Sequence, residues 1–87
     1  MISDHETEHQ HLAVAFATTD LAAETLRRRL PALELLVRQA EERELPERVA
    51  RYREALDAAK AGAERLGREA ERANAKLAKH AGEAPQS

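Results

Sequence analysis

Two long stripes of residues, spaced alternately three and four apart, constrain the fold of this chain more than any other feature. The first runs without a slip from Ile2 to Ala40, and the second runs from Val49 to His80. This spacing keeps all members of a stripe on one side of an α-helix and is typical of a coiled-coil seam. Leu45-Pro46 interrupts the pattern between the stripes, and a proline is tolerated as the first residue of a helix. The sequence therefore predicts an all-α fold, an antiparallel helical hairpin of the coiled-coil type.

Local signals place the ends of the two helices. Ser3 and Glu6 fit a capping box at the start of the first helix, and Gly82 fits the C-cap of the second. We expect a single hairpin domain followed by a short disordered tail. The expected ranges are the domain at 1–82, helix one at 3–44, the turn at 45–46, helix two at 46–81 and the tail at 83–87.

Pro31 conflicts with the first stripe because it lies inside the stripe, at a position on the outer side of the helix. An interior proline destabilises a helix by about 3 kcal/mol and kinks it. Because the stripe keeps its phase across Pro31, we expect one helix that is kinked there. The alternative is a three-helix chain, broken either at Thr18-Thr19-Asp20, which resembles an N-cap, or at Pro31.

Side-chain sizes predict how the two helices are aligned. A tight turn places seam residues opposite each other when their numbers sum to about 89, so that large side chains such as Leu26 face small ones such as Ala63. The same alignment brings His9 close to His80. On the flanks of the seam it predicts two ion pairs, Glu34 with Lys60 and Glu41 with Arg53.

The composition limits the core that one hairpin can form. Hydrophobic residues make up 43% of the 87 residues, but 19 of them are alanine, which contributes little buried volume. Two helices alone would be marginally stable, so we expect a homodimer that forms a four-helix bundle. Interior glycines cost helix stability, and Gly62 and Gly67 are therefore expected to make room for another helix.

Two sets of residues are candidates for binding a partner protein. The first consists of bulky apolar side chains away from the seam, Leu21, Leu35 and Leu36. The second is a basic stripe on the second helix, which recurs at spacings of three and four and can meet an acidic protein surface or phosphates. The basic stripe comprises Arg65, Arg68, Arg72, Lys76 and Lys79.

Three histidines form a candidate metal site. His5 and His9 are four residues apart, a spacing that lets two imidazoles bind one metal ion, and the expected alignment adds His80. Zinc, nickel, copper and iron suit such ligands. The alternative is a polar layer at the open end of the coiled coil, which fixes the alignment of the helices.

Other classes of function are disfavoured by what the chain lacks. It has no cysteine, its serines lie at the two ends, and it has no glycine-rich phosphate loop, so we expect no enzyme, no catalytic residue and no cofactor apart from a divalent metal. Nucleic acid is disfavoured by the near-neutral charge balance and the scarcity of aromatic residues. No segment approaches the length needed to span a membrane or the pattern of a signal peptide, and we expect a cytoplasmic protein.

We therefore expect a small non-enzymatic interaction module, which serves as an adaptor, an assembly factor, or an inhibitor or regulator. Its likeness to such proteins lies in architecture alone. Two alternatives remain open at this point. One is a metal-binding bundle that uses the histidines, and the other is a nucleic-acid-associated regulator that uses the basic stripe.

Overall fold

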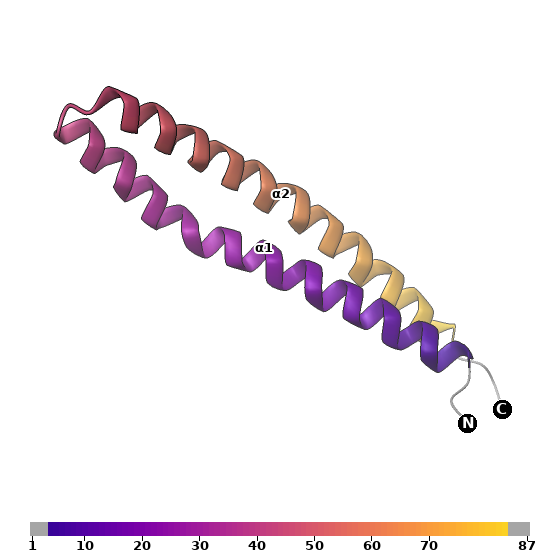
Figure 1. Cartoon of the computed structure of the whole chain (residues 1–87). Coiled ribbons are helices and arrows are strands. Elements are labelled where there is room, and N and C mark those ends of the chain that lie inside the picture. The colour runs from indigo at the N-terminus through magenta and orange to yellow at the C-terminus, as the bar shows by residue number, and fades with distance from the viewer. Residues whose placement is uncertain (1–3, 84–87) are drawn as a thin grey trace.

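The protein folds into two long antiparallel helices joined by a tight turn, as seen in a computed structural model that describes residues 4–83 (Figure 1). Helix α1 comprises Asp4–Glu42 and helix α2 comprises Pro46–Gly82. The expected all-α hairpin is thus confirmed, while dimerisation is a separate question. Ile2, Ser3 and residues 84–87, which enter the expected stripe, capping box and tail, lie outside the described residues.

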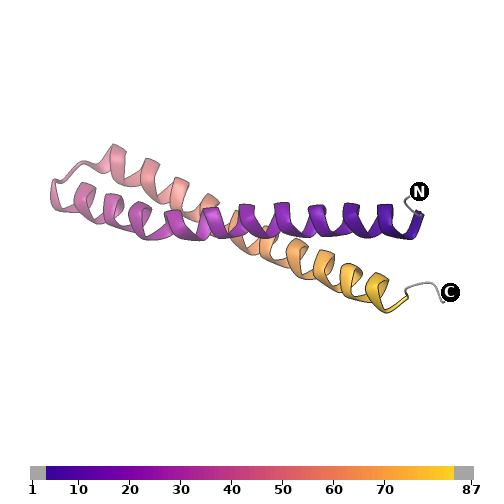
Figure 2. The same cartoon turned by 90° about the horizontal axis from the view of Figure 1, so that it is seen from below.

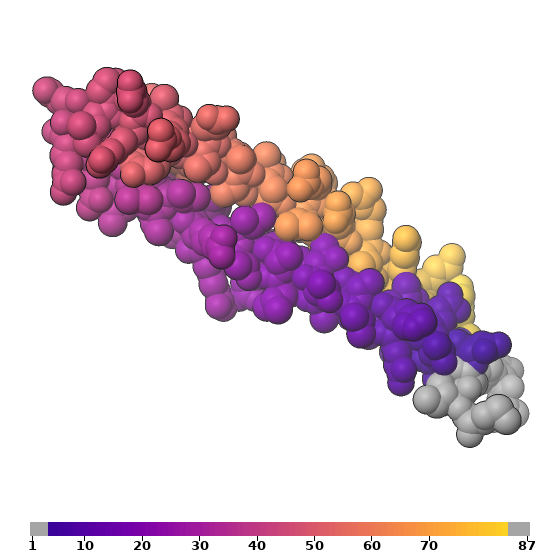
Figure 3. Space-filling view, viewed as in Figure 1, coloured from indigo at the N-terminus to yellow at the C-terminus, as the bar shows by residue number. Residues whose placement is uncertain are grey.

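The hairpin is narrow along its whole length (Figure 3). Its extents are 68 × 20 × 15 Å, and its radius of gyration is 19.5 Å. A compact domain of this length has a radius of gyration of about 12 Å. Figure 2 shows that the two helices cross rather than run strictly parallel, which is the usual geometry when coiled-coil side chains interdigitate.

The seam lies where the stripes predict it. Every described member of both stripes is buried or half-buried, from His5 to Ala40 in α1 and from Val49 to His80 in α2. The core is thin because most of its members are small. The buried apolar residues are Ala23, Val37, Ala40, Leu56, Ala63 and Ala70.

Pro31 does not break α1, so the three-helix alternative is wrong. Pro31 is exposed, and the carbonyl that its missing N–H leaves without a partner can be hydrated from that side. The helix also continues through Thr18-Thr19-Asp20. There the Thr19 hydroxyl donates a hydrogen bond to the Ala15 carbonyl at 2.8 Å, so this side chain bonds within the helix instead of capping a new one.

The turn begins earlier than expected, because α1 ends at Glu42. The Leu45 amide donates to the Ala40 carbonyl at 3.0 Å, and the Glu44 amide donates to the Glu41 carbonyl at 3.1 Å. Glu44 has a φ of 56°. These features define a Schellman motif in which a glutamate occupies the left-handed position usually taken by glycine. Pro46 then starts α2, and the Val49 amide donates to the Leu45 carbonyl.

The other end of α2 differs from the expectation for Gly82. Gly82 is the last helical residue, and its φ is not positive. The C-cap is Glu83, whose amide donates to the carbonyls of Lys79 and His80 at 3.1 Å. Lys79 occupies the last turn of α2, and Asp4 and Glu6 occupy the first turn of α1. The charges at these two ends therefore favour the helix dipoles.

Candidate interaction surfaces

Three contacts show how α1 and α2 are aligned. The rings of His9 and His80 have centroids 5.6 Å apart, as the expected alignment requires. Arg53 Nη2 lies 2.8 Å from Glu41 Oε1, which confirms the second expected ion pair. The first is wrong, because none of the ion pairs among the described residues joins Glu34 to Lys60.

The glycines of α2 make room for α1 of the same hairpin, not for a further helix. A Cβ atom on Gly62 would lie 3.2 Å from Leu26 Cδ1, and one on Gly67 would lie 3.2 Å from Arg27 Nη2. Both glycines are half-buried. The expectation that they admit another helix is thus corrected, because the space next to each is already occupied by a side chain of α1.

The two long sides of the hairpin differ in chemistry. On one side a groove between the helices is lined by small and apolar residues with one charged side chain, namely Leu26, Arg29, Ala32, Leu33, Ala55, Ala58 and Ala59. On the other side the lining is largely charged and contains Arg27, Leu30, Lys60, Ala63, Glu64, Gly67, Arg68 and Glu71. This asymmetry arises because the flanking positions on one side of the seam hold mainly charged residues, while those on the other hold several alanines.

The side of α1 that points away from α2 carries exposed bulky residues. Val14 is 64% exposed, Leu21 is 63% exposed and Leu35 is 48% exposed. With the exposed Ala17 and Ala32 beside them, these residues form a surface that we call the outer face of α1. Leu36 borders this face and is 39% exposed. Of the three candidates, Leu21 and Leu35 therefore lie on the outer face and Leu36 lies at its border.

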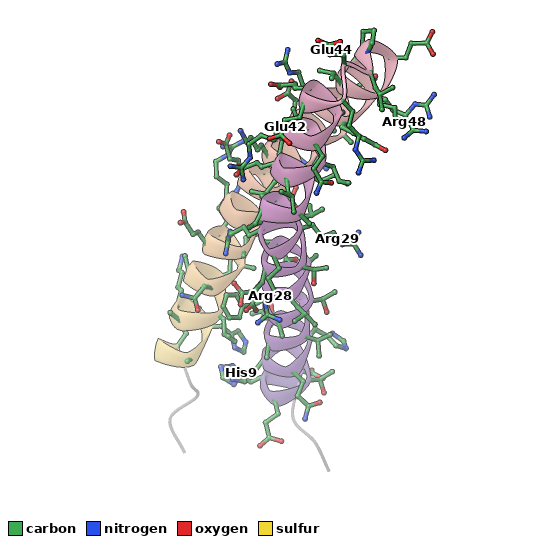
Figure 4. The ribbon with its side chains drawn as sticks, turned by 90° about the vertical axis from the view of Figure 1, so that its left-hand side faces the viewer. His9, Arg28, Arg29, Glu42, Glu44 and Arg48 are labelled. Atoms are coloured by element: carbon green, nitrogen blue, oxygen red, sulfur yellow. The ribbon has the colours of Figure 1, made fainter. Side chains whose placement is uncertain are left out.

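One ion pair interrupts the outer face of α1 near its middle. Arg28 Nη2 lies 2.6 Å from Glu24 Oε1, one turn earlier on the same helix. The side chains of Arg28 and Arg29 leave α1 in different directions (Figure 4). Of the two arginines, Arg28 is the one that belongs to the outer face of α1, seven residues after Leu21.

The basic stripe of α2 is solvent-exposed along its whole length. No ion pair within 4.0 Å joins any of its five members to a carboxylate in the part of the chain that the structure describes. Glu64, Glu69 and Glu71 are interspersed with the stripe and are also exposed. The stripe is thus an exposed surface of mixed charge, and its member Arg68 also lines the charged groove between the helices.

The three histidines meet at the open end of the hairpin. The His5 ring stacks on the His80 ring with centroids 3.9 Å apart and 15° between the ring planes. His5 Nε2 also lies 3.2 Å from the His80 carbonyl oxygen. In Figure 4 the His9 ring extends from α1 toward α2, and its plane is inclined by 26° to that of His80.

This stacking does not suit a shared metal ion. The lone pairs of an imidazole lie in the ring plane, so stacked rings direct them along nearly parallel planes rather than toward one point. No group of three or more metal-binding side chains with suitable geometry is found among the described residues. The three rings form a polar layer at the open end of the hairpin, and metal binding by His5, His9 and His80 stays a prediction.

His80 is the unusual member of this layer. It is 8% exposed, and neither of its ring nitrogens forms a hydrogen bond. Glu8 Oε2 lies 3.4 Å from His80 Nε2, which constitutes an ion pair only when the imidazole is protonated. The sequence places His80 at this end of the hairpin, but periodicity alone does not show that its ring is buried without hydrogen-bond partners.

Comparisons of the chain with protein-family models, with curated proteins and with solved structures find no match. Neither helix, within the described range, has a stretch that is both long and apolar enough to cross a membrane.

Proposed function

We propose that this protein is a non-enzymatic protein–protein interaction module that self-associates and acts as an adaptor, assembly factor or regulator. The observation that carries the proposal is the outer face of α1, where Val14, Leu21 and Leu35 are exposed on the side opposite the seam. A helix that is apolar on two opposite sides is usually packed on both. In this hairpin, α2 covers only one of them.

The surface area of the hairpin supports the same proposal. The chain exposes 6836 Å², whereas a compact monomer of this length exposes about 5,100 Å². A standard protein–protein interface covers about 800 Å² on each partner. Association of two hairpins would therefore bury part of the large surface area that a single hairpin exposes to water.

The two helices would have different roles in such an assembly. The outer side of α2 carries the basic stripe, which remains well hydrated and would meet acidic groups of a second protein through rim contacts. The outer face of α1 would provide the apolar centre of the interface. On this proposal the protein works in the cytoplasm. This compartment is reducing and does not support disulfide bonds, and a chain without cysteine does not depend on them.

Light scattering on the purified protein tests the proposal. We expect a dimer for the natural chain and a monomer for the double variant Leu21→Gln, Leu35→Gln, which removes two exposed apolar side chains without touching the seam. The matched control is Ala61→Gln, Ala75→Gln, which changes two exposed residues of α2 and should leave the dimer intact. A monodisperse natural monomer, or equal behaviour of the two variants, would contradict the proposal.

A further inference from the structure

The bulky residues of the outer face of α1 follow a strict seven-residue spacing. Val14 and Leu21 are seven residues apart, Arg28 follows seven later, and Leu35 seven after that. In a coiled-coil helix, residues seven apart lie on one line along the helix. The outer face therefore has the repeat of a second helix–helix seam, about 32 Å long from Val14 to Leu35 at 1.5 Å per residue.

We propose that a second copy of this chain occupies this seam, with its α1 antiparallel to the first and the two-fold axis beside Glu24 and Thr25. In this arrangement Val14 packs against Leu35 of the second copy, and Ala17 packs against Ala32. Paired residues have numbers that sum to about 49, as an isologous two-fold contact requires. The inference rests on the proposed function and adds the partner, the orientation and the alignment.

Charge selects the antiparallel orientation over the parallel one. In a parallel pair the same residues face each other, so Arg28 would meet Arg28 and Glu24 would meet Glu24. Like charges in such positions destabilise a coiled coil and exclude it as a partner. In the antiparallel pair each Arg28 lies near Glu24 of both chains, and its apolar stem covers Leu21 of the second copy.

Charge and side-chain size also distinguish between antiparallel alignments. Moving the axis to Arg28 would place the two Arg28 side chains together and Val14 against Glu42. Moving it to Leu21 would place Leu35 against Thr7. Of these three alignments, the one centred beside Glu24 and Thr25 gives both Val14 and Leu35 apolar partners and separates the arginines.

The side chains near the proposed axis are compatible with close packing. The Thr25 hydroxyl donates to the Leu21 carbonyl at 2.9 Å, so this polar group is already satisfied within its own helix and Thr25 need not bury an unpaired hydroxyl. Arg28 and Glu24 are also paired within their own helix. The centre of the interface would therefore bury no unpaired charge.

Disulfide trapping tests this geometry, because the natural chain contains no cysteine. Val14→Cys and Leu35→Cys are prepared separately, mixed under reducing conditions so that subunits exchange, and then oxidised. We expect a covalent dimer in the mixture and none with either variant alone, because Val14 and its copy would be about 32 Å apart. Both positions are exposed in the hairpin, so neither substitution should disturb its fold.

Each other outcome contradicts the inference in a distinguishable way. Covalent dimers with Val14→Cys alone and also with Leu35→Cys alone would show a parallel pair and overturn the orientation while leaving the proposed self-association intact. A cross-link only between Leu21→Cys and Leu35→Cys would overturn the alignment. A dimer by light scattering that forms no cross-link in the mixture would place the interface elsewhere, and a monomer would overturn the proposed function as well.

Discussion

The imidazole rings of His5 and His80 lie stacked at 3.9 Å, although the two residues are 75 positions apart in the sequence. The contact closes the open end of a hairpin whose helices are covalently joined only at the far end (Figure 1). It also covers His80, whose buried ring nitrogens have no hydrogen-bond partner. A polar group buried in this way destabilises the folded state relative to an apolar group of similar shape.

We therefore expect His80→Leu to stabilise the hairpin by up to about 1 kcal/mol. His80→Ala should destabilise it by about 1–2 kcal/mol, because it leaves a void beside His5. Thermal unfolding followed by circular dichroism at pH 8, where an imidazole in water is neutral, measures both. A His80→Leu variant that is no more stable than the natural chain would show that burial of the ring nitrogens has no cost.

Glu44 has a left-handed backbone conformation, with a φ of 56°. This conformation costs an L-residue about 1–2 kcal/mol, while glycine adopts it freely but gains more freedom in the unfolded chain. We expect Glu44→Gly to raise the free energy of unfolding by about 0.5–1 kcal/mol, measured by urea denaturation. Glu42→Gly, within α1, is the control and should lower it. A loss of stability in both variants would contradict the assigned turn.

Gly62 and Gly67 should respond differently to alanine. Alanine stabilises a helix interior by about 1 kcal/mol relative to glycine. At Gly67 the added methyl meets the flexible end of Arg27, which can move away, so Gly67→Ala should gain most of this amount. At Gly62 it meets Leu26 Cδ1 in the half-buried seam, so Gly62→Ala should gain less or lose stability.

Chemical denaturation of both glycine variants checks this order. Gly82→Ala is a useful third variant, because no atom lies within 4 Å of the added Cβ. Its effect should be small, since helix ends fray. A larger gain at Gly62 than at Gly67 would mean that the two helices are less closely packed near Leu26 than the structure indicates.

The Glu41–Arg53 ion pair should contribute modestly to stability. Both side chains are partly exposed, and exposed pairs contribute about 0–1 kcal/mol. A double-mutant cycle with Glu41→Gln and Arg53→Gln should give a coupling energy in this range that falls as salt is raised. The matched control is the Glu34 and Lys60 cycle at the equivalent flank, where we expect no measurable coupling. Coupling of the same size in both cycles would contradict the observed difference.

The seam was predictable from the sequence because it depends on periodicity alone. Each described stripe residue, from His5 to His80, lies on the protected side of its helix, since α-helical geometry assigns a side of the helix to every position. The break at Leu45-Pro46 then required the second stripe to fold back on the first. The match of large and small side chains at the seam was enough to predict the alignment of the two helices. The contacts of His9 with His80 and of Arg53 with Glu41 confirm that alignment.

Other features depended on the tertiary structure. Two features result from how closely the two helices approach each other. Glu44, and not a glycine, adopts the left-handed conformation in the turn. Side chains of α1 occupy the space beside Gly62 and Gly67. The sequence placed three histidines at one end, but only the packing showed that their rings stack and that His80 loses its water. Periodicity determines which side of a helix a residue occupies, whereas helix separation and side-chain conformation determine what it touches.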